Sequence, residues 1–154
     1  MPDMQEIVRR YLEQVTVMQL ATSANDQPWV CNVHYYCDQK LDIFWVSTTS
    51  RRHSQEISKN PKVGATVLAH VNTPAKNYVV GISIAGVAEL IGEQVDEQVG
   101  VGYVTKHNKD DSFLADIASG KNPHKFYRLR PSQIVLFDSK HFPDNPRQEW
   151  FPAN

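Results

Sequence analysis

The chain has 154 residues, 41% of them hydrophobic, which is typical of one domain with a single core, so we expect one domain over residues 1–154. Its 16 basic and 17 acidic side chains give a formal charge of -1, which disfavours nucleic acid as a partner. Its apolar runs are far shorter than the roughly 20 residues of a membrane helix. The N-terminal segment MPDMQEIVRR carries acidic residues where a secretory signal would have an apolar core. We therefore expect a cytoplasmic protein without a membrane partner.

The N-terminal third predicts one helix and three strands. Asp3 is placed to cap a helix whose apolar residues recur at helical spacing, namely Met4, Ile7, Val8, Tyr11 and Leu12. An antiparallel meander is predicted next, with strands over residues 17–22, 28–37 and 41–47 and polar turns between them. Cys31 and Cys37 fall on the second strand, too far apart along it to form a disulfide bond, so both are expected to be reduced.

The remaining elements do not alternate regularly. Strands are predicted over residues 62–71, 78–91, 126–129 and 133–137, the last two as a closing hairpin around Pro131. Helices are predicted from near Ser50 to residue 60 and over 94–104 and 112–118, and a loop over 72–77. Gly81 and Gly86 indicate a bend or a close backbone approach within the long strand. The pattern predicts a mainly β protein with helical additions, a small antiparallel barrel of six or seven strands.

The most informative segment is WVSTTSRRHSQEISKNP, residues 45–61. Hydroxyl groups and two arginines stand there beside the predicted start of a helix, where backbone N–H groups lack partners, and this combination suits a phosphate group. The alternative is an ordinary helix start, with Ser50 as the cap and two solvated arginines. The spacing alone leaves both interpretations open.

The order of features resembles the FMN-binding split-barrel superfamily, which includes pyridoxamine 5'-phosphate oxidase and the general stress flavoproteins. The similar segments read MQLATSANDQPWVCNVHYYCD, LDIFWVSTTSRRHSQEISKNPKVGATV and YVVGISIAGVAELIGE. The resemblance implies a six- to seven-stranded antiparallel split β-barrel of the FMN-binding type. It also implies a homodimer with the flavin at the subunit interface.

The resemblance implies roles for individual residues. Asn32, Val33 and His34 would lie along the strand whose backbone faces the isoalloxazine ring. Ser47 and Thr48 would end the next strand beside the ring and the ribityl chain.

The same resemblance implies a phosphate site in the loop that follows. Arg52 and His53 occupy the superfamily's arginine and lysine positions, with Ser50 and Arg51 as neighbours. His53 replaces the usual lysine and is a weaker, pH-dependent phosphate ligand, so Arg51 or Arg52 is expected to supply most of the charge. Gly81 stands where the oxidase has a flavin-contacting glutamine, and it offers only backbone.

Three tryptophans and six histidines are candidates for further roles. Trp29, Trp45 and Trp150 have the rings to wall a flat ligand, but tryptophans more often serve cores and interfaces. Trp150 is the best candidate of the three for the site, because its apolar tail QEWFP should dock and a partner subunit often closes over the flavin in this superfamily. The six histidines show no metal-ligand spacing, so no metal is expected.

These features predict an FMN-dependent oxidoreductase acting on a small molecule stacked on the flavin, with no catalytic side chain assigned. The chain ends without the substrate segment of true pyridoxamine phosphate oxidases, so vitamin B6 oxidation is not expected. A non-catalytic module that binds a flavin, haem or a deazaflavin is the alternative. For haem, the possible axial ligands are His34, His124 and His141.

Overall fold

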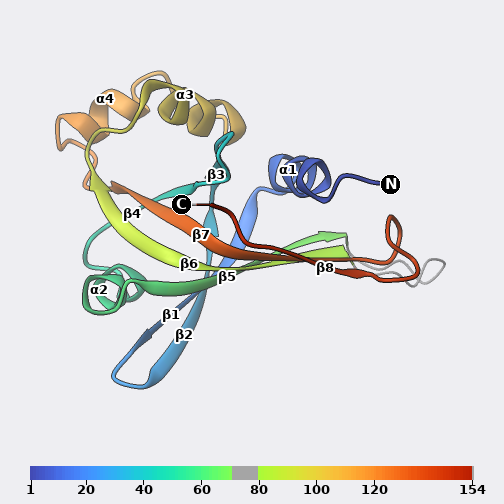
Figure 1. Ribbon diagram of the computed structural model, residues 1–154. Coiled ribbons are helices and arrows are strands. Elements are labelled where there is room, and N and C mark those ends of the chain that lie inside the picture. Colours follow the sequence, from blue (N-terminus) through green and yellow to red (C-terminus); the bar gives the residue numbers. More distant parts are fainter. Residues whose placement is uncertain (71–79, 154) are drawn as a thin grey trace.

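The computed structural model describes residues 1–70 and 80–153, and it is dominated by one strongly curled antiparallel sheet (Figure 1). Seven strands lie in the order β2-β1-β5-β6-β7-β4-β3, and β8 pairs with β7. The strands are β1 (Val17–Ala24), β2 (Gln27–His34), β3 (Tyr36–Cys37), β4 (Ile43–Ser47), β5 (Lys62–His70), β6 (Val80–Gly92), β7 (Lys125–Asp138) and β8 (Arg147–Trp150). The helices are α1 (Met4–Gln14), α2 (Arg52–Lys59), α3 (Glu97–Lys106) and α4 (Phe113–Ala118). The predicted mainly β split barrel with helical additions is confirmed.

Helix α1 forms as predicted. The Asp3 carboxylate accepts a hydrogen bond from the backbone N–H of Gln5 at 2.9 Å and caps the helix. Its predicted apolar stripe is buried through Ile7, Val8, Tyr11 and Leu12. At the other end, the carbonyl of Leu12 accepts bonds from the Tyr35 hydroxyl at 2.9 Å and from Lys106 Nζ at 2.8 Å. The last turn of α1 is therefore stabilised by a cation that α3 supplies.

The first hairpin is longer than predicted, and its second strand is shorter. Asn25 and Asp26 both have positive φ angles, 54° and 59°, which suits a tight two-residue turn and lets β1 continue to Ala24. The predicted strand over 28–37 is interrupted at Tyr35, whose side chain is fully buried, so the chain forms β2 and a separate short β3. Cys31 and Cys37 therefore lie on different strands, and both are free thiols as expected.

The closing hairpin predicted around Pro131 is wrong, because β7 runs through this residue without a turn. Pro131 lies opposite Gly86 at a register shift in the β6–β7 ladder, so the ladder does not require its missing N–H. A Cβ atom at Gly86 would overlap the carbonyl of Arg130. Gly86 thus allows the close backbone approach that its sequence position suggested.

Other predicted boundaries shift by a few residues. Helix α2 begins at Arg52 rather than near Ser50, and α3 begins at Glu97 because Asp96 caps it through a 3.0 Å bond from the N–H of Gln98. The predicted loop over 72–77 and the start of the strand over 78–91 lie outside the described residues. No helix in the described part of the chain is both long and apolar enough to span a membrane.

Two apolar clusters hold these elements together. The larger lies inside the curl of the sheet and against α1, and it includes Trp45, which is fully buried and stacked on Tyr127 with ring centres 5.7 Å apart. The smaller joins Tyr103, Ile117 and Phe126 beneath α3 and α4. Trp45 is thus a core residue and not a wall of a ligand site.

We predict that Gly86→Ala lowers the free energy of unfolding by about 1 to 3 kcal/mol, because the added methyl group collides with backbone that cannot move without breaking the β6–β7 ladder. Urea denaturation checks this. Gly81→Ala is the matched control on the same strand, since its Cβ atom would be 3.8 Å from the nearest atom, an ordinary contact. Equal stability of the two variants would contradict the proposed close approach.

Candidate functional site

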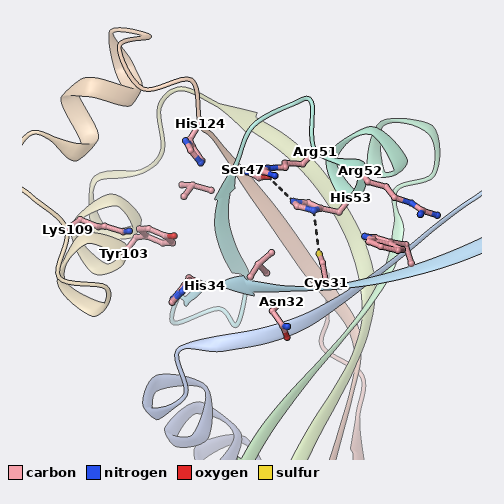
Figure 2. A pocket seen from close by; sticks show the side chains of 13 residues that line it. Cys31, Asn32, His34, Ser47, Arg51, Arg52, His53, Tyr103, Lys109 and His124 are labelled. Atoms are coloured by element: carbon pink, nitrogen blue, oxygen red, sulfur yellow. Dashed lines mark hydrogen bonds between the residues drawn. The ribbon is translucent and has the colours of Figure 1, made fainter.

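A pocket of about 620 Å³ lies where the curled sheet fails to close, between β2 and the end of β4 (Figure 2). These strands are not hydrogen-bonded neighbours: β2 is an edge strand, and four strands (β1, β5, β6 and β7) lie between it and β4 in the sheet order. The start of α2 forms one end of the pocket, and residues from α3 and the segment before β7 form the other. No aspartate or glutamate is among the described residues that line it.

Strand β2 supplies the wall that was predicted to face a flat ring. Asn32, Val33 and His34 all line the pocket. The side-chain oxygen of Asn32 accepts a 2.9 Å bond from Gln19 on β1, which fixes its orientation. Trp29, on the same strand and 40% exposed, also lines the pocket, so this tryptophan is better placed for a ligand than the sequence analysis inferred.

The N-terminus of α2 has no side-chain cap. Arg51 occupies the cap position, and the first helical bond runs from the N–H of Gln55 to the Arg51 carbonyl at 3.0 Å. The backbone N–H groups of the first turn before Gln55 therefore have no acceptor within the helix. The Ser50 hydroxyl instead lies 3.1 Å from the Thr48 hydroxyl. The interpretation of this segment as a helix start capped by Ser50 is therefore wrong.

The two arginines beside this helix start differ in their contacts. Arg52 Nε donates to Glu56 at 2.8 Å, and its guanidinium lies 4.1 Å from the centre of the Trp29 ring. Bonds from Arg52 and from Thr22 lower the pKa of Glu56. Arg51 makes no hydrogen bond or ion pair through its side chain with any described residue, and Figure 2 shows it turned toward Ser47. The whole guanidinium group of Arg51 is thus available to a ligand.

His53 bridges the two sides of the gap. Its Nε2 is 2.8 Å from the Ser47 hydroxyl on β4, and its Nδ1 is 3.4 Å from the Cys31 sulfur on β2. Burial, followed by the nearby Arg51 charge, lowers the pKa of His53, so the imidazole is neutral at pH 7. Burial likewise raises the pKa of Cys31, which keeps it a thiol. With His53 neutral, positive charge at this end comes from the two arginines.

The opposite wall was not identified from the sequence. Tyr103 on α3, Lys109 in the following turn and His124 before β7 line the pocket there. The sequence marks His124 only as a possible haem ligand and does not single out the other two. Their position depends on how α3 packs against the second apolar cluster, and neither their spacing nor their composition carries a signal of it.

The remaining predicted site residues lie elsewhere in this chain. Thr48 and Ser50 adjoin the pocket through their neighbours Ser47 and Arg51 but are not among its lining residues. Trp150 pairs with Ile134 on β7, packs partly against the main core and is not among the lining residues of the pocket, so the tail docks as expected. Within the described residues, no cluster of three or more His, Cys, Asp or Glu side chains is arranged to hold a metal ion.

His141, the third possible haem ligand, is engaged outside the pocket. Its Nδ1 lies 2.6 Å from the buried carboxylate of Asp138, and the Tyr11 hydroxyl donates to the same carboxylate at 3.0 Å. Burial opposes the ionisation of Asp138, but the bonds from His141 and Tyr11 outweigh it and lower the pKa of this carboxyl. This cluster fixes the turn after β7 to α1 and does not contribute to the pocket.

Comparison with solved structures places this architecture among known proteins. A conserved hypothetical protein from Mycobacterium tuberculosis is similar with a TM-score of 0.73 at 18% identity, over 93% of this chain and 89% of that one. The haem storage protein HutZ from Vibrio cholerae is similar with a TM-score of 0.65 at 18% identity, over 89% of this chain and 95% of that one. General stress protein 26 from Bacillus anthracis is similar with a TM-score of 0.59 at 15% identity, over 86% of this chain and 92% of that one. These identities establish a shared fold only.

A comparison with curated proteins found no match. The family model described as pyridoxamine 5'-phosphate oxidase, in contrast, matches residues 4–137, which include every strand of the curled sheet except β8 and the whole start of α2. The chain therefore belongs to the pyridoxamine 5'-phosphate oxidase family of split β-barrels.

Proposed function

We propose that the chain is an FMN-binding protein and that it works as an FMN-dependent oxidoreductase on a small molecule stacked against the flavin. The observation that carries this proposal is the uncapped N-terminus of α2, which opens beside two arginines into a pocket without acidic lining residues. Family membership and the fold support it independently.

The phosphate end of the cofactor fits the start of α2. Unpaired N–H groups and the helix dipole favour an anion there, and Arg51 is free to form a charge-assisted bond with it. Arg52 is held by Glu56 through Nε, which leaves its two terminal nitrogens for a phosphate oxygen. His53 is neutral and already bonded to Ser47, so it positions the pocket and does not neutralise the phosphate.

The ring end fits the wall formed by β2. Asn32, Val33 and His34 present backbone and side chains along one side of the pocket, and Trp29 adds an aromatic surface held by Arg52. A pocket of about 620 Å³ is within the range that cofactor-sized ligands occupy. When bound, FMN would supply the electron-transfer chemistry, while these residues orient the ring and limit access to it.

A homodimer is proposed because the centre of one side of the sheet carries no charged side chain. The Arg147–Glu149 ion pair of β8 borders this region beside Phe137 and Val135. Strand alternation and register place on this side the residues Thr66, Leu68, Gly81, Ser83, Ala85, Val135 and Phe137, which we call the uncharged face. Leu68 is 51% and Phe137 is 43% exposed, and such apolar exposure across three strands favours a partner. Gln19 connects Thr66 on this face to Asn32 in the pocket, so a partner docked here would reach the flavin site.

Haem binding is a second candidate, favoured by two imidazoles that line the pocket in addition to His53. His34 and His124 both line it. His124 uses Nδ1 for a 2.7 Å contact with the Asn122 side-chain oxygen, which leaves Nε2 for an axial bond. HutZ, a similar structure, is a haem storage protein.

We predict that the purified protein retains FMN through gel filtration and that Arg51→Ala weakens FMN by about 10- to 150-fold, which corresponds to the loss of one charged phosphate contact of about 1.5 to 3 kcal/mol. Arg52→Ala should also weaken FMN binding, because it removes a phosphate contact and the guanidinium that lies over the Trp29 ring. Isothermal titration with FMN measures both variants. The matched control is Lys59→Ala, which removes a cation from the other end of α2.

Absorption spectra recorded after adding FMN or haemin separate the two candidates. A flavin spectrum that survives gel filtration supports the proposed function. A Soret band with haemin, combined with no retention of FMN, would overturn it in favour of the haem site, as would FMN affinity that is unchanged in both arginine variants.

We further predict that Ala85→Arg converts the dimer into a monomer in sedimentation experiments and lowers FMN affinity at the same time, because a buried charge disrupts the uncharged face. Val101→Arg is the matched control, since Val101 is 54% exposed on α3, away from that face. A monomeric Ala85→Arg protein that binds FMN as tightly as the parent would contradict the shared site.

A further inference from the structure

Three polar side chains on the wall opposite Arg52 have no role in the FMN proposal. They are Tyr103, Lys109 and His124, which come from α3, the turn after it and the segment before β7. Figure 2 shows them grouped on the side of the pocket away from Arg52. The pocket therefore carries positive charge at both ends, from Arg51 and Arg52 at one end and from Lys109 at the other, and β2 forms the wall between them.

Tyr103 is built into the protein and yet keeps a free hydroxyl. Only 2% of the residue is exposed, and its ring stacks on Phe113 and meets Phe126 edge-on, with ring centres 5.9 Å apart in both pairs. Its hydroxyl makes no hydrogen bond with any described residue, although the residue lines the pocket. Burial raises the pKa of Tyr103 to about 12, so the phenol remains a donor at neutral pH.

Lys109 and His124 are also open to a ligand. The Lys109 ammonium lies 5.4 Å from the centre of the Phe113 ring and forms no ion pair with a described carboxylate. The Asn122 side-chain oxygen accepts from the backbone N–H of His124 at 3.0 Å and contacts His124 Nδ1 at 2.7 Å. Because this oxygen is an acceptor, Nδ1 carries the proton, and Nε2 is an acceptor that suits a ligand hydroxyl or amine but does not donate to an anion.

We propose that Tyr103 and Lys109 form a subsite for the carboxylate of a small planar substrate that lies against the cofactor ring. The inference rests on the proposed FMN function, which assigns the arginine end of the pocket to the cofactor phosphate. One lysine balances the single charge of a carboxylate, and the free phenol hydroxyl donates a hydrogen bond to one of its oxygens. Bidentate guanidinium groups, which suit a phosphate, occur at the other end.

The test uses the FMN-loaded protein and three probes of similar shape: benzoate, neutral benzamide and phenyl phosphate. Binding is measured by titration and by the change in the flavin absorption spectrum. Benzoate should bind at least about tenfold more tightly than benzamide, and Tyr103→Phe and Lys109→Met should each remove about tenfold of benzoate affinity. Lys121→Met, a cation exposed between α4 and β7, is the matched control and should behave like the parent.

Each result has a defined meaning, because FMN affinity is measured separately for every variant. Equal binding of benzoate and benzamide to the FMN-loaded parent overturns the subsite while leaving the proposed function intact. Tighter binding of phenyl phosphate than of benzoate overturns the assignment to a carboxylate. Loss of FMN affinity in Lys109→Met, matching its loss of benzoate, also overturns the proposal, since Lys109 would then belong to the cofactor site. Failure of the parent to bind FMN refutes the proposed function itself.

Discussion

The gap between β2 and β4 determines where a ligand can bind, and one imidazole spans it. The sheet curls until its two ends approach, but the strands there do not pair. His53 contacts Ser47 on one side and Cys31 on the other, while α2 carries it at the point where its own backbone donors are unpaired. The same short segment therefore fixes the width of the opening and provides an anion-binding helix start inside it.

A neutral His53 is consistent with its role of bridging β2 and β4. A charged imidazole would place a third cation beside Arg51 in a partly buried position, and burial together with that arginine lowers the pKa of His53. The acidic partner of the region, Glu56, points its oxygens at Thr22 and Arg52 and stays out of the pocket lining. Acidic charge is thereby used to orient an arginine without cancelling the positive character of the pocket.

Local signals in the sequence were sufficient for the elements that depend on local chemistry. Asp3 and the apolar stripe predicted α1, and the polar segment before α2 predicted its N-terminus to within two residues. The hairpin predicted around Pro131 was wrong because proline occurs both in turns and at β-bulges. Whether the chain turns or bulges at Pro131 depends on its partner Gly86 on β6, which is distant in the sequence. Tyr103 and Lys109 gave no signal, since only the packing of α3 turns them toward β2.

That packing is tied to β2 itself, which explains how two walls from distant segments keep a fixed separation. Tyr35 follows directly after β2, and its carbonyl oxygen lies 2.7 Å from His107 Nε2 at the end of α3. Burial is the main factor that lowers the pKa of His107, so its ring is neutral and donates this bond through Nε2. Lys106, the preceding residue, bonds to α1 and lies 3.9 Å from the centre of the Tyr35 ring. Because these contacts anchor α3 just beyond His34, a ligand held between the walls meets a preorganised cavity, and less ordering of the protein is needed on binding.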